Sequence, residues 1–137
     1  MRETLLGLLI ALPGIGVLIS TVLGLQLWRF VRARPGIETE TDLLVFKRVV
    51  AGQMYGALAQ IVVLGSPLVL FFYGIWAKVL AVRDVTYLIL PSLVVLAVGL
   101  LFKRVEGRAR RMQVAEPLRQ AYDHVVRVWF KKALPDW

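Results

Sequence analysis

Three long runs without a charged residue constrain this chain more than any other feature of its sequence. They cover residues 4–28, 49–77 and 85–102, and they contain 25, 29 and 18 residues. A helix of about 20 apolar residues is long enough to cross the hydrocarbon core of a bilayer. The runs do not alternate between apolar and polar residues, and they are longer than the ~9–11 residues of a membrane barrel strand. We therefore predict an all-α integral membrane protein with three transmembrane helices.

The composition of the chain supports the same class. Hydrophobic residues make up 58% of the 137 residues, charged residues make up 19%, and the mean hydropathy is +0.70. Soluble domains contain about 45–50% apolar and about 25% charged residues. The sequence has no cysteine, which excludes disulfides, thiolate metal sites and cysteine nucleophiles. The first run follows the N-terminus closely, but it is too long for the apolar core of a signal peptide, and we expect a permanent span.

The connections between the runs predict how the helices follow one another. Residues 78–84 form a short connection, so the second and third spans should make an antiparallel hairpin. In the longer loop 29–48, the pattern from Thr39 to Asp42 fits a helix-capping sequence. We expect a helix to begin there and to continue into the second span. We place the transmembrane domain at residues 1–102.

Each run contains one proline, a residue that removes a helical hydrogen bond and favours a kink. These prolines are Pro13, Pro67 and Pro91. Glycines at positions 14 and 16 follow the first of them, which makes a bend or a local break possible there. Broken helices can mark transport sites, but an ordinary kinked helix is the interpretation that we favour.

Basic residues are distributed unevenly between the two sides of the predicted spans. The chain carries a formal net charge of +8, and five of its 17 basic residues lie in loop 29–48 and nine lie after residue 102. Basic residues near span ends mark the cytoplasmic side. We expect an N-terminus outside and a cytoplasmic C-terminus in a membrane of the bacterial inner-membrane type. Anionic lipid explains this charge, and we expect no nucleic-acid partner.

Small and polar residues inside the runs form candidate helix-packing faces. Membrane helices associate through close approach at small residues and through side-chain hydrogen bonds. The candidate residues are Gly16, Ser20, Gly24, Gly52, Gly56, Gln53 and Gln60. They could contact the other helices of the same chain, another subunit, or a polar path. The sequence leaves these alternatives open.

The region after residue 102 is expected to form a basic cytoplasmic tail, residues 103–137. Within it, residues 117–133 fit an amphipathic helix with an apolar arc of roughly 160°. Such a face has to be covered, either by the membrane surface or by a groove on a partner protein. We favour the membrane surface. The residues expected to make this contact are Leu118, Tyr122, Val125, Trp129, Arg108, Arg111, Lys131 and Lys132.

The sequence contains no feature that points to catalysis. No Asp, Glu, Lys, Arg or His lies within the three runs, and the only histidine, His124, lies in the tail. Proton relays and ion-coupled carriers normally need ionisable groups inside the membrane. We expect no enzyme activity, cofactor or metal. The leading hypothesis is an accessory subunit of a larger membrane complex, with other membrane subunits and anionic lipids as partners. The alternative is a small homo-oligomeric transporter or channel lined by Gln53, Gln60, Ser66 and the bend near Pro13.

Overall fold

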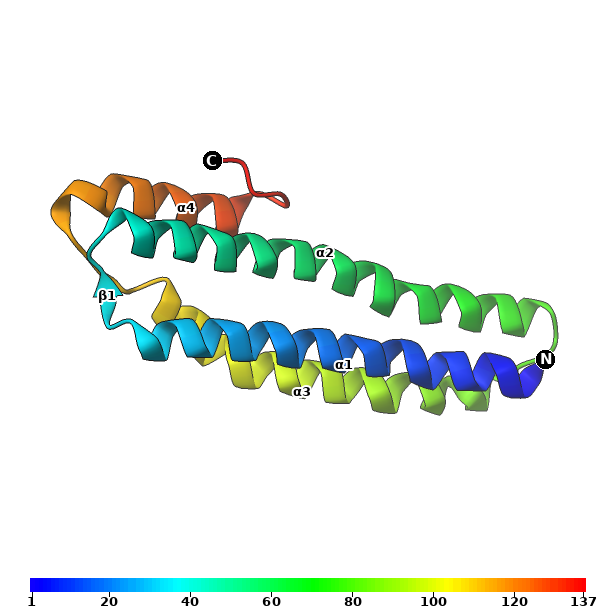
Figure 1. The fold of residues 1–137 in the computed structure, drawn as a ribbon. Helices are drawn as coiled ribbons and strands as arrows, with labels where there is room; N and C mark the ends of the chain where they lie inside the picture. The colour runs from blue at the N-terminus through cyan, green and yellow to red at the C-terminus, as the bar shows by residue number, and fades with distance from the viewer. The chain divides into compact units, whose positions relative to one another are not determined.

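The computed structural model describes residues 1–137 and is almost entirely helical. Its long helices are α1 (Arg2–Ala33), α2 (Glu40–Trp76) and α3 (Thr86–Ala109), and a shorter helix, α4 (Arg119–Lys131), follows near the C-terminus. Two 3₁₀ turns, η1 (Val82–Val85) and η2 (Glu116–Leu118), precede α3 and α4 (Figure 1). Three helical segments are long and apolar enough to cross a membrane. The prediction of an all-α chain with three such helices is confirmed.

The helices extend beyond the uncharged runs that predicted them. The first turn of α2 begins in the loop where the capping pattern lies, as predicted. The third helix continues through Gly107 to Ala109. Pro13 and Pro67 lie inside α1 and α2, and neither helix is interrupted. The local break considered near Pro13 is therefore absent.

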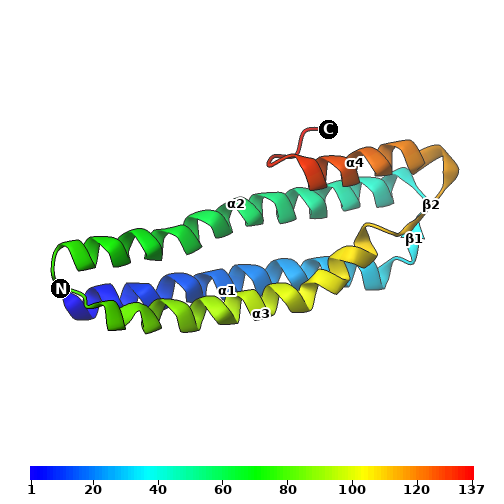
Figure 2. The same cartoon turned by 180° about the vertical axis from the view of Figure 1, so that it is seen from behind.

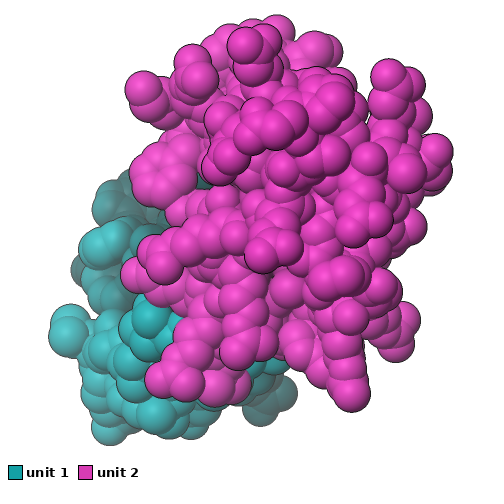
Figure 3. All heavy atoms as spheres, turned by 90° about the vertical axis from the view of Figure 1, so that its left-hand side faces the viewer, with its two compact units in different colours: residues 1–21, 59–100 teal, residues 22–58, 101–137 magenta.

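The chain divides into two compact units, which Figure 3 colours separately. Unit 1 contains residues 1–21 and 59–100, and unit 2 contains residues 22–58 and 101–137. The three long helices pass through both units, and residues of the predicted tail belong to the second.

Unit 1 is organised around a small apolar core at the ends of its helices. The buried side chains of this core are Leu5, Leu9, Phe71, Leu80 and Leu88. After α2, the chain turns through Lys78, which has a positive φ of 58°. The amides of residues 79 and 80 both donate to the carbonyl of Gly74, at 2.9 and 3.0 Å. These bonds satisfy carbonyl groups that a helix end leaves unpaired.

Unit 2 contains the larger core and the only two strands. The buried members of this core are Phe30, Ile37, Leu43, Phe46, Val50, Met54, Tyr122, Val125 and Val128. The strands β1 (Gly36–Ile37) and β2 (Gln113–Val114) pair in parallel, with Gly36 opposite Gln113. A Cβ atom at position 36 would lie 2.6 Å from the carbonyl oxygen of Gln113, so this pairing requires glycine.

Helix α4 lies alongside the first half of α2 in unit 2 (Figures 1 and 2). It begins after a 3₁₀ turn that contains Pro117, close to the predicted position, and it ends at Lys131, before the predicted end at residue 133. The apolar face of this helix is thus covered by the chain itself.

Candidate functional site

In unit 1, a glutamine on α2 forms hydrogen bonds with the small-residue face of α1. The Nε2 atom of Gln60 donates to the carbonyl of Gly16 at 2.7 Å and to the Oγ of Ser20 at 2.6 Å. The Oε1 atom of the same amide is buried and has no hydrogen-bond partner. A Cβ at position 16 would lie 3.0 Å from this oxygen, so the absence of a side chain there leaves room for the amide.

In unit 2, a second glutamine makes the equivalent connection. The Nε2 atom of Gln53 donates to the carbonyl of Leu23 at 2.8 Å. One helical turn farther along α2, Gly56 packs directly against the side chain of Leu23, and Gly24 packs against the ring of Phe102. A side chain at either glycine would collide with its neighbour. By contrast, nothing lies within 4 Å of a Cβ placed on Gly52.

The candidate packing residues therefore differ in where they point. Six of the seven make contacts within the chain, and Gly52 faces open space. Both glutamine donors are engaged with α1 rather than with a polar path. Of the alternatives left open by the sequence, contact among the helices of one chain is the one found for these six residues.

The contrast between Gly56 and Gly52 gives a direct test. Gly56→Leu forces a side chain onto Leu23, and overpacking of this kind costs about 1–3 kcal/mol. The matched change Gly52→Leu introduces the same side chain into open space and gains helix propensity. We expect thermal unfolding in detergent, followed by circular dichroism, to show a lower Tm for Gly56→Leu alone. Equal Tm values for the two variants would contradict the packing described here.

The apolar face of α4 packs into the core of unit 2, and this corrects one of the predictions. Tyr122 and Val125 were expected to contact the membrane surface or a partner, but their exposed fractions are 4% and 0%. Leu118 and Trp129 are partly buried against the same core. The sequence showed that this face needs a cover, and the cover is α2 of the same chain.

A pattern on α2 explains why it can receive α4. Leu43, Phe46 and Val50 recur at helical spacing and are all buried, whereas charged residues occupy positions 47 and 48 between them. The ring of Phe46 lies at the centre, 5.0 Å from the ring of Tyr122 and 6.5 Å from that of Trp129. The matching apolar stripe at the start of α2 was the sequence signal that could have predicted this contact.

Tyr122 also connects α4 to the end of α3 by hydrogen bonds. Its hydroxyl donates to the carbonyl of Ala109 at 2.6 Å and accepts from the amide of Met112 at 3.2 Å. These are backbone groups that the end of α3 leaves without helical partners. Burial raises the pKa of the Tyr122 hydroxyl, so the neutral form is the one that the folded protein favours.

We expect Tyr122→Phe to destabilise unit 2 while preserving the ring contacts. The change removes both hydrogen bonds and leaves a backbone carbonyl unpaired, which costs about 1–2 kcal/mol. Thermal unfolding measures this loss, and Tyr55→Phe, which alters an exposed hydroxyl, is the matched control.

The pH dependence provides an independent check of the same contact. Because the pKa of Tyr122 is raised on folding, its contribution is complete below pH ~10 and is lost as the pH rises through the folded-state value. The stability difference between wild type and Tyr122→Phe should therefore shrink above pH ~10. A difference that stays constant there, or no difference at neutral pH, would rule out the bonded and buried hydroxyl.

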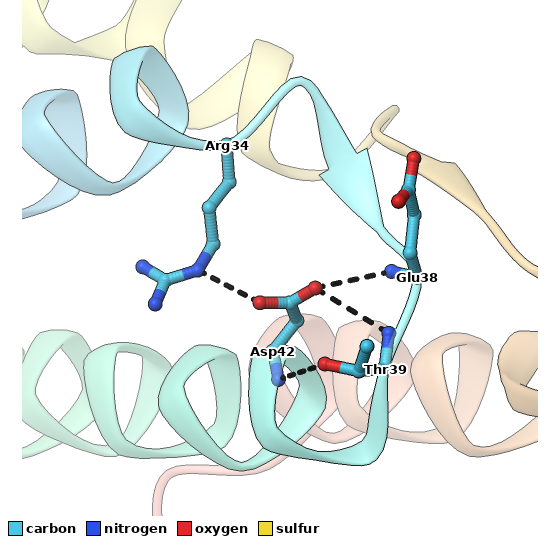
Figure 4. Close-up of polar contacts among 4 residues, drawn as sticks. All are labelled: Arg34, Glu38, Thr39 and Asp42. Carbon is cyan, nitrogen blue, oxygen red and sulfur yellow. Dashed lines mark hydrogen bonds and ion pairs between the residues drawn. The ribbon is translucent and has the colours of Figure 1, made fainter.

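The start of α2 is fixed by a capping arrangement that Figure 4 shows in detail. The amide of Asp42 donates to the Oγ1 of Thr39 at 3.2 Å, and the amide of Thr39 donates to the Asp42 carboxylate at 3.4 Å. This is the reciprocal pattern predicted from the sequence. The other carboxylate oxygen accepts from Nε of Arg34 at 3.0 Å, which connects the end of α1 to the start of α2.

Unit 2 contains a hollow lined by four arginines, which we call the arginine hollow. It has a volume of about 710 Å³ and lies at the ends of α1 and α3. Its lining residues are Val31, Arg34, Pro35, Arg104, Gly107, Arg108, Arg111, Met112 and Gln113. Two of the predicted contact residues, Arg108 and Arg111, are therefore brought together here. The other two basic residues lie elsewhere: Lys131 is exposed, and Lys132 pairs with Asp136.

Two structural contacts were missed by the sequence analysis. The carboxylate of Asp84 is buried, accepts from Nη2 of Arg2 at 3.0 Å and accepts from the amide of Ala81 at 2.9 Å. This contact connects the N-terminus to the turn before α3. The second is the two-residue strand pair, which is too short to produce a periodic pattern. An isolated aspartate next to an arginine in a short connection was the only signal for the first.

Comparison with known proteins does not assign the chain to a family. The chain matches no protein-family model, and neither a curated protein nor a solved structure is detectably similar to it.

Proposed function

We propose that this chain is a non-catalytic subunit of a larger assembly in a membrane. The observation that carries the proposal is that the side-chain donors of Thr21, Gln53, Gln60, Ser66 and Ser92 bond within the chain, while most of the helix surface is exposed. In the most apolar windows of the three segments, only 22%, 17% and 11% of the residues are buried. A large exposed apolar surface is suited to contact with lipid and with the helices of other subunits.

The polar side chains within the apolar runs support a structural role over a conducting one. The hydroxyls of Thr21, Ser66 and Ser92 each donate to the carbonyl four residues earlier, at 2.8, 2.6 and 2.7 Å. The two glutamine amides donate to α1. A path lined by Gln53, Gln60 and Ser66 would have to take its donors away from these bonds.

One helix face remains available for another subunit. Gly7, Ala11 and Gly14 share a face of α1, and nothing lies within 4 Å of a Cβ placed on either glycine. Small residues allow the backbone of a second helix to approach closely. We propose that a transmembrane helix of a different subunit packs on this face.

Replacement of Ala11 by leucine tests this role. Ala11→Leu fills the open face and should reduce the recovery of partner subunits after mild detergent extraction, as measured by native mass spectrometry. Ala97→Leu is the matched control, since position 97 lies among large exposed side chains of α3. A wild-type sample that contains only copies of this chain would support the homo-oligomeric alternative and contradict the proposal.

The proposed orientation places the N-terminus outside and the C-terminus in the cytoplasm of a bacterial-type inner membrane. The distribution of basic residues supports it. We expect a membrane-impermeant maleimide to label Arg83→Cys but not Asp123→Cys in intact cells, because both positions are exposed and lie in predicted segments on opposite sides. Labelling of both after cell lysis is the control. The reverse labelling pattern would invert the orientation.

A further inference from the structure

We propose that the arginine hollow binds the phosphate of an anionic lipid headgroup. Four arginines from two separate parts of unit 2 surround one space: Arg34 follows α1, whereas Arg104, Arg108 and Arg111 belong to the end of α3 and the residues after it. Guanidinium groups present paired N–H donors that match the oxygens of a phosphate. This inference goes beyond a role as a subunit and requires only that the chain lies in a membrane.

Three of the four arginines that line the hollow are not paired with an acidic side chain of the protein. No acidic side chain lines the hollow. Arg104, Arg108 and Arg111 take part in none of the salt bridges of the structure. Arg34 uses only its Nε atom for Asp42, and its two terminal nitrogens are free to bind another anion (Figure 4). The charge of these three arginines would attract an anion.

The spacing of Arg104 and Arg108 places both on one side of α3, since residues four apart share a helical face. Arg111 follows in the turn after the helix and lines the same hollow. Basic residues at a helix C-terminus also interact favourably with the helix dipole. Arg34 reaches the same hollow from the residue that follows α1.

An adjacent hollow with apolar side chains in its lining favours a lipid over a soluble phosphate. This second hollow, of about 280 Å³, is lined by Trp28, Val31, Arg32, Val105 and Arg108. It shares Val31 and Arg108 with the arginine hollow. An amphiphile can place its phosphate among the arginines and its apolar portion beside Trp28, whereas a soluble phosphate would use only the first space.

The position of the hollows along the helices matches the depth of a headgroup. Trp28 and Phe102 are the last residues of two uncharged runs. At 1.5 Å per helical residue, Arg104 lies about 3 Å beyond its run, and Arg108 lies about 9 Å beyond it. The headgroup layer on each side of a bilayer is about 5–8 Å thick. The arginines thus start at the hydrocarbon boundary and extend through this layer.

The test uses the full chain in detergent, supplied with equal amounts of phosphatidylglycerol and phosphatidylcholine, and native mass spectrometry measures the retained lipid. Wild type should retain phosphatidylglycerol in preference to phosphatidylcholine. Arg104→Gln with Arg108→Gln should lower that retention roughly ten- to thirtyfold, since each arginine near an anionic lipid contributes about one factor of five. Arg127→Gln with Lys131→Gln removes the same charge from the exposed side of α4 and should retain the lipid.

Two further measurements test whether the hollow variant is folded and whether the hollow binds a lipid or a soluble phosphate. Circular dichroism checks that the hollow variant keeps its helices, and Arg111→Gln provides a milder single change with a smaller expected loss. Soluble glycerol 3-phosphate, added to wild type, presents the phosphate without acyl chains and should not displace the lipid. Displacement by that compound would assign the site to soluble phosphates and overturn the lipid proposal. Equal lipid loss in the hollow and α4 variants, or no loss in either, would also overturn it.

Discussion

The amide donor of a glutamine in apolar surroundings needs a hydrogen-bond partner inside the protein, because such surroundings offer none. This constraint governs both units of the chain. In unit 1, Gln60 donates to the backbone of α1 at Gly16, and in unit 2, Gln53 donates to the carbonyl of Leu23. An unpaired amide in an apolar medium costs several kcal/mol. Each glutamine therefore fixes which face of α2 turns toward α1, and the glycines beside these bonds permit the close approach.

The same reasoning extends to the C-terminal helix, where the group that needs cover is an apolar face. A 13-residue helix is marginal in water on its own. The side chains around Phe46 supply the cover, and the Tyr122 hydroxyl supplies partners to the end of α3. Docking of α4 leaves its charged side exposed. Arg104, Arg108 and Arg111, at the end of α3 and just after it, take part in none of the ion pairs of the protein.

The sequence was informative wherever a feature is periodic or local. Uncharged runs identified the three long helices, and the pattern at Thr39 and Asp42 located the start of α2. Gln53 and Gln60 are seven residues apart, so their spacing alone places them on one face of α2. These features depend on neighbours within a few residues or on helical geometry.

The features that the sequence did not reveal depend on long-range pairing. An amphipathic arc shows that Tyr122 and Val125 must be covered, but it does not say by what. Gly52 and Gly56 look alike as a motif, and only the position of Leu23 separates them. Arg34 meets three arginines some seventy residues later in the sequence because β1 pairs in parallel with β2. Strands of two residues are too short to be predicted from a sequence pattern.

Hydrogen–deuterium exchange of α4 in the full chain tests most directly whether the chain itself covers the apolar face of this helix. The measurement compares nanodiscs of phosphatidylcholine alone with nanodiscs that also contain phosphatidylglycerol. Docking on α2 predicts slow exchange of the amides of residues 122–129 in both, because the cover is part of the chain. Fast exchange in phosphatidylcholine and protection only with phosphatidylglycerol would show that the membrane surface holds this helix, and would contradict the docked core around Phe46.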